Sequence, residues 1–134
     1  MAREILFKAK RKDNGEWVEG YYQKRYDEIG RERHFIFWCK SNIVWEYVEI
    51  DINTLCQYTG KKINRKKCFE GDVIFARRSL LYVGWDDVFL MWMTYYFDDV
   101  GNQITFCPLC DIADWETEDI RGNIFDNPEL LGGE

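Results

Sequence analysis

Proline and histidine are scarce in this chain of 134 residues, and long apolar runs are missing. It has two prolines and a single histidine, His34. It contains neither a nucleophile-elbow motif nor a phosphate-binding glycine loop. No residue therefore stands out as a catalytic group, and we do not expect an enzyme. The longest apolar run, residues 88–97 interrupted by Thr94, is too short to span a bilayer. Charged residues interrupt the first twelve positions, where a secretory signal needs an apolar core. We therefore expect a cytoplasmic protein that does not contact a membrane.

Cysteine occurs in an odd number, which argues against a disulfide framework. The five cysteines are expected to be reduced thiols. Cys107 and Cys110 have the two-residue gap of half a zinc site, but a closed site needs two more ligands. The other candidate ligands are Cys39, Cys56, Cys68 and His34. We favour ordinary thiols at Cys107 and Cys110, keep zinc as the alternative, and expect no cofactor.

Positive charge is nearly missing from the end of the chain. Residues 79–134 hold one basic residue, Arg121, against 12 acidic ones, whereas residues 1–78 hold 17 basic and 12 acidic residues. The whole chain has a net charge of -6. Such polarity favours self-association or a partner of defined charge, although solvated charges on opposite faces of one fold are the simpler interpretation.

Aromatic residues, by contrast, are abundant. They make up 17% of the chain, beside 46% hydrophobic and 31% charged residues, which is the composition of a soluble globular protein. The favoured interpretation is a β-rich core in which large rings pack across strands. The alternative is an aromatic surface that stacks a base or a sugar.

The first residues predict a β-hairpin. The turn signal Asp13-Asn14-Gly15 separates strands over residues 4–10 and 16–22. Side chains alternate along a strand, so one face of the second strand carries Trp17, Glu19 and Tyr21.

A second hairpin is predicted after a surface loop. Residues 23–33 are dense in charge and indicate that loop. The hairpin strands cover 34–39 and 43–50, and the second alternates imperfectly, so we expect both of its faces to be partly covered. A single helical turn follows over 51–55, capped by Asp51 or Asn53.

The rest of the chain predicts strand after strand. The expected strands cover 73–76, 80–85, 88–97, 103–106 and part of 118–127. A short helical finish at Pro128 is expected, with Asn127 as its cap. Many short strands without a helical period predict a mainly β fold, and a small rolled barrel is the natural way to remove exposed edges.

Two glycine turns frame a basic loop in the middle of the chain. The first turn is Thr59-Gly60 and the second is Glu70-Gly71-Asp72, where glycine supplies a positive φ and the carboxylates can accept hydrogen bonds from turn amides. Both are interpreted as structural. Between them lies the basic loop, which consists of Lys61, Lys62, Arg65, Lys66 and Lys67.

Three blocks in sequence order resemble the YopX family of bacteriophage and prophage proteins. They are Arg3–Ala9 with Gly15–Tyr21, Gln57–Gly60 with Phe69–Ile74, and Ile120–Leu131. The resemblance implies one domain over 1–134, with N-terminal antiparallel hairpins over about 1–56 and an SH3-like barrel or roll over about 57–134. It implies no activity, cofactor or catalytic residue. This chain departs from the family between Gly60 and Phe69, where Asn64-Arg65 replaces the usual Asn-Gly type of turn, so a regular hairpin there is in question.

Two functions remain open. The favoured one is a non-enzymatic protein-interaction module in the bacterial cytoplasm, which binds a host or phage protein or a second copy of itself. The alternative is a small nucleic-acid-binding barrel. It would use the basic loop together with Arg77 and Arg78, since flexible cations contact phosphates.

Overall fold

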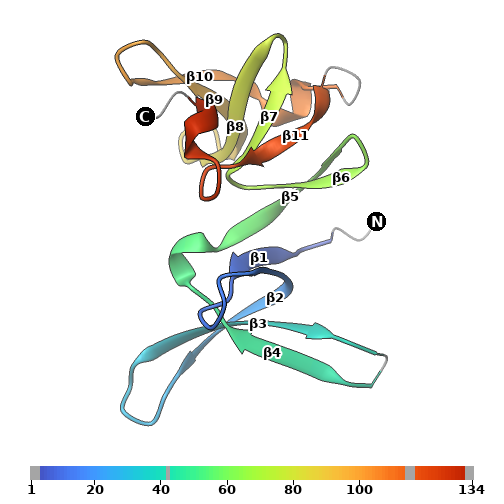
Figure 1. The fold of residues 1–134 in the computed structure, drawn as a ribbon, viewed down its shortest axis with the longest axis vertical. Helices are drawn as coiled ribbons and strands as arrows, with labels where there is room; N and C mark the ends of the chain where they lie inside the picture. The colour runs from blue at the N-terminus through green and yellow to red at the C-terminus, as the bar shows by residue number, and fades with distance from the viewer. Residues whose placement is uncertain (1–3, 42, 114–116, 132–134) are drawn as a thin grey trace. The chain divides into compact units, whose positions relative to one another are not determined.

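The computed structural model describes residues 4–41, 43–113 and 117–131 (Figure 1). It is built from antiparallel strands and short 3-10 turns, so the mainly β prediction is confirmed. The chain divides into two compact units, residues 1–58 and 59–134. No helix among the described residues is long and apolar enough to cross a membrane.

Unit 1 is an antiparallel sheet whose strands lie in the order β4-β3-β2-β1-β5. Its elements are β1 (Phe7–Lys10), β2 (Trp17–Tyr26), β3 (Glu32–Cys39), β4 (Trp45–Glu49), η1 (Ile52–Thr54) and the start of β5 (Cys56–Ile63). The predicted turn at Gly15, which has a φ of 75°, joins β1 to β2. Asp51 caps η1 as expected, because its carboxylate accepts from the amide of Asn53 at 3.0 Å.

One face of this sheet is covered and the other is open. The fully buried centre consists of Ala9, Ile36 and Ile50. Around it pack the partly buried Phe7, Val18, Tyr22, Trp38, Val48 and Leu55. Because neighbours along a strand point to opposite sides, the residues between these, Tyr21, Phe37 and Tyr47, face away from the core.

One prediction about unit 1 is wrong. Residues 23–33 are not a loop, because β2 continues to Tyr26 and β3 begins at Glu32, which leaves a tight turn at 27–31. Cross-strand pairing and the Asp27 carboxylate, which accepts from the amides of Ile29 and Arg31, outweigh the polar composition. On β4, one side carries the half-buried Glu46 and Val48, and the other carries Trp45 and Tyr47, which are 55% and 62% exposed.

Unit 2 contains the β5–β6 hairpin and a five-stranded antiparallel sheet in the order β10-β9-β8-β7-β11. Its further elements are β6 (Lys66–Phe69), β7 (Asp72–Ala76), β8 (Ser79–Asp86), β9 (Met91–Phe97), β10 (Gln103–Pro108), η2 (Leu109–Asp111), β11 (Thr117–Asn123) and η4 (Pro128–Leu131). β10 and β11 are the edges, so the described strands do not close into a barrel, and the SH3-like barrel is not confirmed.

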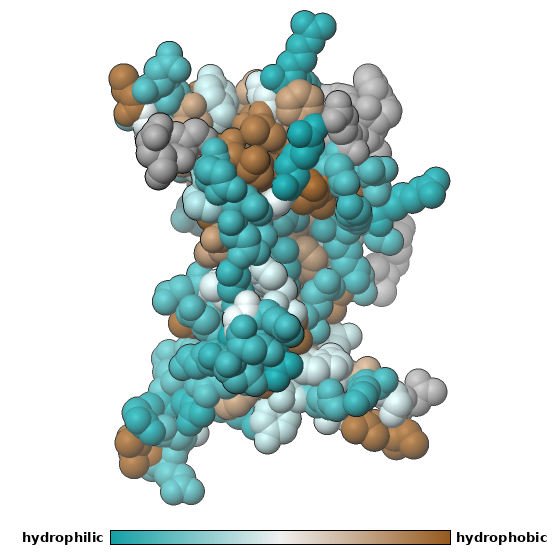
Figure 2. Space-filling view, in the orientation of Figure 1, coloured by the Kyte–Doolittle hydropathy of each residue, from teal (hydrophilic) through white to brown (hydrophobic). Residues whose placement is uncertain are grey.

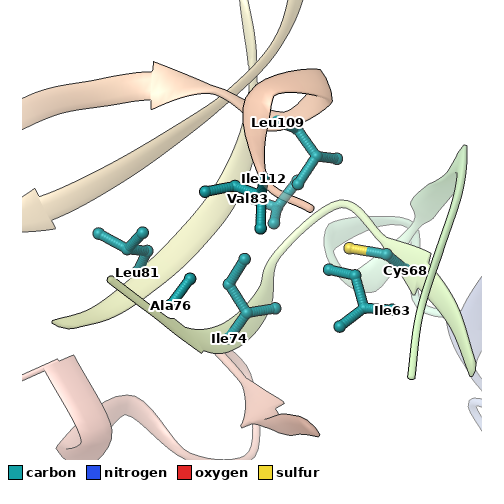
Figure 3. Close-up of a cluster of buried hydrophobic side chains, with 8 residues drawn as sticks. All are labelled: Ile63, Cys68, Ile74, Ala76, Leu81, Val83, Leu109 and Ile112. Carbon is teal, nitrogen blue, oxygen red and sulfur yellow. The ribbon is translucent and has the colours of Figure 1, made fainter. Parts of the chain in front are cut away.

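The core of unit 2 joins the hairpin, the sheet and η2 (Figure 3). It consists of Ile63, Cys68, Ile74, Ala76, Leu81, Val83, Leu109 and Ile112, each at most 2% exposed. One expectation needs correction, since β9 begins at Met91 rather than at Val88. Asn127 directly precedes η4, and its side chain accepts from the Asn123 amide at 3.3 Å.

Candidate interaction sites

The basic loop is a regular β-hairpin, which we call the basic hairpin from here on. Asn64 and Arg65 form the two-residue turn between β5 and β6, with φ values of 50° and 68°. This is the φ pattern of a type I′ turn, which suits the twist of paired strands, and asparagine tolerates it well. The departure from Asn-Gly therefore does not remove the hairpin. The turn leaves Lys62, Arg65 and Lys66 exposed.

The other predicted basic residues lie at a different turn. Arg77 and Arg78 join β7 to β8, with φ values of 49° and 66°. Arg77 donates to the backbone oxygen of Asp111 at 2.8 Å. On the basic hairpin itself, Lys66 forms an ion pair of 2.8 Å with Asp119, and this contact lowers the pKa of that carboxyl. Part of the basic charge is thus matched by the acidic end of the chain.

The two glycine turns hold strands together. The hydroxyl of Thr59 donates to the backbone oxygen of Cys68 at 2.8 Å, across the β5–β6 hairpin. Gly60 and Gly71 have φ values of 90° and 85°, which glycine adopts without strain. Gly71 donates to Val83 at 2.7 Å, and the buried carboxylate of Asp72 accepts from the Phe69 amide at 2.8 Å. Glu70 is half-buried within the same turn.

The β8–β9 hairpin ends in an exposed apolar turn, which we call the apolar tip and which consists of Val88, Phe89, Leu90 and Met91. Their exposed fractions are 84%, 59%, 70% and 38%. Leu90 has a φ of 55°. A leucine in the left-handed region is strained, and four exposed apolar side chains in succession are costly in water. Neither feature helps the hairpin to fold.

The apolar tip is held by one carboxylate at its base. Asp86 accepts from the amides of Val88 and Phe89, both at 2.9 Å, and from the hydroxyl of Tyr95 at 3.0 Å. The bond from the Phe89 amide is the main reason that the pKa of Asp86 is lowered. Burial and the bond to Asp86 raise the pKa of Tyr95 to about 12, so the hydroxyl remains a donor at neutral pH. The conformation of the tip is therefore fixed before any partner binds.

Unit 1 carries a second exposed surface, which we call the aromatic face. It consists of Tyr21 on β2, Phe35 and Phe37 on β3, and Trp45 and Tyr47 on β4. The ring centres of Tyr21, Phe37 and Trp45 lie 5.8 to 6.2 Å apart, and those of Phe35 and Tyr47 are 5.8 Å apart. Tyr21 is 48% exposed. In the space-filling view, hydrophobic residues also lie at the outer ends of the β2–β3 and β3–β4 hairpins (Figure 2).

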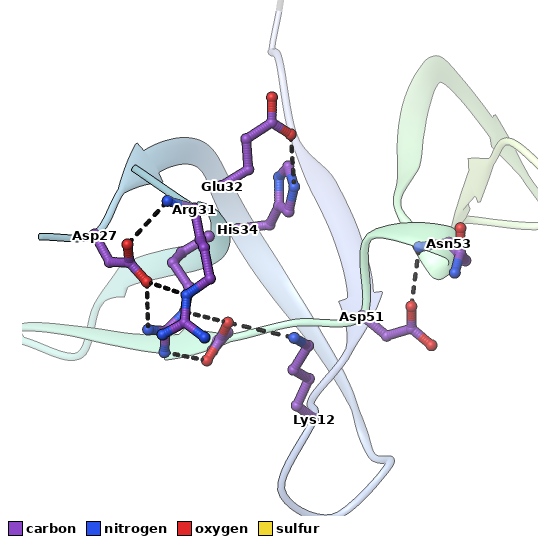
Figure 4. A network of polar contacts seen from close by, with 9 residues as sticks. Lys12, Asp27, Arg31, Glu32, His34, Asp51 and Asn53 are labelled. Carbon is purple, nitrogen blue, oxygen red and sulfur yellow. Dashed lines mark hydrogen bonds and ion pairs between the residues drawn. The ribbon is translucent and has the colours of Figure 1, made fainter. Parts of the chain in front are cut away.

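Arginines border the aromatic face. The guanidinium of Arg25 lies over the rings of Phe35 and Tyr47, at 5.3 and 5.5 Å from their centres. The guanidinium of Arg33 lies 6.0 Å from the ring centre of Phe35 and makes two hydrogen bonds of 2.6 Å with Glu49. Lys12 and Asp27 extend this polar network, in which Arg31 also contacts Asp27 (Figure 4).

Unit 1 also has an open hollow of about 540 Å³. Its lining includes Lys10, Arg11, Lys12, His34 and Asp51. Arg11 is paired with Asp13 at 2.8 Å and Lys12 with Glu49 at 3.4 Å, while His34 contacts the hydroxyl of Tyr22 at 2.7 Å. Each of these three side chains is thus held by a partner outside the lining of the hollow, which is a structural arrangement.

The zinc candidates lie in different settings. Cys107 is half-buried on β10, where its sulfur is 3.4 Å from the hydroxyl of Thr94, and Cys110 is exposed on η2. Across residues 4–41, 43–113 and 117–131, no three His, Cys, Asp or Glu side chains are grouped as metal ligands would be.

Sequence reasoning missed the apolar tip, and it raised an aromatic stacking surface only as an alternative, without naming its residues. For the apolar tip the signal was present, since Asp86-Asp87 is a polar turn start that directly precedes the apolar run at Val88. For the aromatic face, the alternation of Trp45 and Tyr47 placed both rings on one side of β4. Nothing in the sequence indicated that this side is uncovered.

The comparisons with known proteins give one result. A family model described as YopX protein matches residues 6–132. Neither the curated proteins nor the solved structures gave a match.

Proposed function

Since the chain belongs to the YopX family, we propose that it is a phage- or prophage-encoded accessory protein that works by binding another protein rather than by catalysis. Its place of action would be the cytoplasm of a bacterial host. Unit 2 would then be an open variant of an SH3-like barrel, which presents its binding site on a hairpin turn.

The observation that carries this proposal is the apolar tip. Val88 and Leu90 are more than two-thirds exposed, and Asp86 fixes the backbone that bears them. A binding interface can be built around an aromatic or aliphatic anchor that enters a pocket of the partner, and an anchor that is already ordered loses less entropy on binding. The strain at Leu90 fits a functional site, where such costs are retained for binding.

Charge indicates the kind of pocket that would receive the tip. Between residues 79 and 113 there is no lysine or arginine, while Asp86, Asp87, Asp98, Asp99 and Asp111 are acidic. A partner pocket that is apolar inside and basic at its rim would match this pattern. A surface of anionic lipid would not, because it would repel the same carboxylates.

The proposal is tested by capture from phage-infected host lysate, with nuclease-treated and untreated arms. We expect a partner that is retained after nuclease treatment and lost with Phe89→Asp. Val100→Asp is the matched control, because Val100 is 80% exposed at the separate β9–β10 turn. Capture that survives Phe89→Asp, or that Val100→Asp removes equally, would contradict the tip as the binding site. A mass that changes with protein concentration would indicate that the partner is a second copy.

The basic hairpin supports a second candidate, binding of nucleic acid. Its type I′ turn presents Arg65 to solvent beside Lys62. Heparin or oligonucleotide retention that disappears with salt and with replacement of the five cations of the hairpin would support it. No retention at low salt would eliminate it.

A further inference from the structure

We propose that the aromatic face of unit 1 binds single-stranded nucleic acid by stacking bases on its rings. This site is separate from the apolar tip and from the basic hairpin, both of which belong to unit 2. The inference starts from the unequal exposure of the two sides of the sheet in unit 1. One side of the sheet formed by β2, β3 and β4 is covered by the core. The other side carries six aromatic rings, Trp17 and the five of the aromatic face, of which Tyr21, Trp45 and Tyr47 are exposed.

The rings are placed as a platform. They lie on three adjacent strands, in register, so that Tyr21, Phe37 and Tyr47 form one row across the sheet. Trp45 and Phe35 flank this row, with centre distances of 5.8 Å to Phe37 and Tyr47 respectively. A sheet surface with exposed aromatic rings is suited to unpaired bases, since every base has a flat face that can stack. Paired bases in a duplex cannot reach it.

The local charge suits a polyanion. By strand alternation, the side of the sheet that bears the rings carries Lys8, Lys10, Arg25 and Arg33 against Glu19 and Glu49. Arg33 and Glu49 are matched to each other. The guanidinium of Arg25 lies over two of the rings, where it can meet the phosphate of a nucleotide stacked beside it.

The distribution of acidic residues fits the same conclusion. Residues 1–58 carry ten basic and ten acidic residues, whereas residues 59–134 carry 8 basic and 14 acidic ones. The net charge of -6 therefore belongs to unit 2. Unit 1 by itself therefore has no net negative charge that would repel a polyanion from the aromatic face.

The number of cations predicts how binding depends on salt. The four cations and two carboxylates on this side of the sheet leave a net charge of about +2, which corresponds to about two phosphate contacts. The affinity for a single strand should then fall about sevenfold between about 50 and 200 mM salt. If instead the five cations of the basic hairpin made the contacts, the same change would cost about a hundredfold. The salt dependence thus distinguishes the two nucleic-acid sites.

The test is fluorescence anisotropy of the full chain with labelled oligo(dT) and oligo(U) of about twelve nucleotides, and with the corresponding duplex. We expect Tyr47→Ala and Trp45→Ala each to weaken single-strand binding about 5- to 150-fold, and Tyr47→Phe to retain it because the ring remains. Tyr26→Ala is the matched control. Tyr26 is also 62% exposed, but it lies at the end of β2 and points to the other side of the sheet.

Three results would overturn the inference. One is the absence of single-strand binding at low salt. Another is that Trp45→Ala binds the single strand as tightly as the wild type, while only the variants of the basic hairpin lose binding. The third is a wild-type dimer that Trp45→Ala dissociates, since a second copy would then cover the rings. Circular dichroism of each variant confirms that the sheet is intact, so none of these results reflects unfolding.

Discussion

Arg33 and Glu49 lie on the neighbouring strands β3 and β4, and their side chains meet in two hydrogen bonds of 2.6 Å. These bonds, with the charge of Lys12 as a further cause, lower the pKa of Glu49 from 4.5 to about 2. A lowered pKa means that the folded state favours the carboxylate. Its stabilising effect is present above pH 4.5 and is lost as the pH falls toward 2.

We therefore expect Glu49→Gln to lower the free energy of unfolding by about 1–3 kcal/mol at pH 7. Denaturant unfolding at several pH values measures this difference, which should disappear as the pH approaches 2. Glu28→Gln, at the exposed β2–β3 turn, is the control and should change little. A difference that is the same at pH 7 and at pH 2 would contradict the role of the carboxylate.

Gly20 on β2 lies close against the backbone of β3. A β-carbon at this position would overlap the backbone oxygen of Phe37, which cannot move without disturbing the sheet. We expect Gly20→Ala to destabilise the protein by about 1–3 kcal/mol. Gly15→Ala is the control for replacing a glycine without a steric clash. At Gly15 a β-carbon meets open space, and only the positive φ is strained. Equal losses in the two variants, read from thermal unfolding, would rule out the clash.

Leu90 is strained by its own backbone. Leu90→Gly removes the penalty of a left-handed leucine and adds the entropy cost of glycine, so we expect stability that is unchanged or higher by about 1 kcal/mol. Leu90→Ala keeps the strain and should be no more stable than the wild type. Both are measured by thermal unfolding. If both variants are clearly less stable than the wild type, the leucine side chain contributes packing and is not retained for binding.

The turn of the basic hairpin allows charge to be removed without loss of structure. Arg65 has a φ of 68°, which glycine adopts more readily. We expect Arg65→Gly to preserve or raise thermal stability by up to about 1 kcal/mol. The same variant weakens heparin retention only if the basic hairpin binds polyanions. A clear drop in the unfolding temperature would show that the arginine side chain supports the turn.

Short sequence motifs correctly predicted the turn and the helix cap that they form themselves. Asp13-Asn14-Gly15 sets the first hairpin and Asp51 caps η1, because both act over a few residues. The error at residues 23–33 has the opposite cause. Their charges predicted a loop, yet Gln23 to Tyr26 pair with Glu32 to Phe35 along the extended β2–β3 hairpin. Strand length depends on the partner strand, which composition does not reveal.

The candidate sites were harder to predict, because exposure depends on tertiary packing. The aromatic content predicted rings in the core, and Tyr22 and Trp38 do pack there. Trp45 and Tyr47 have the same chemistry and remain exposed, because no described residue of unit 1 covers their side of the sheet. Phe89 sits in an apolar run that predicted a strand, but the hydrogen bonds to Asp86 turn the chain there.

Photo-crosslinking from position 89 tests the central claim, that the apolar tip is a pre-ordered protein-binding site. A photoreactive phenylalanine analogue replaces Phe89 in one protein and Val100 in the control, and both are exposed to host lysate after nuclease treatment. We predict that one protein is crosslinked from position 89 and not from position 100. The yield should fall when Asp86→Ala removes the acceptor that orders the tip. Equal crosslinking from the two positions, or a yield that Asp86→Ala leaves unchanged, would contradict the account.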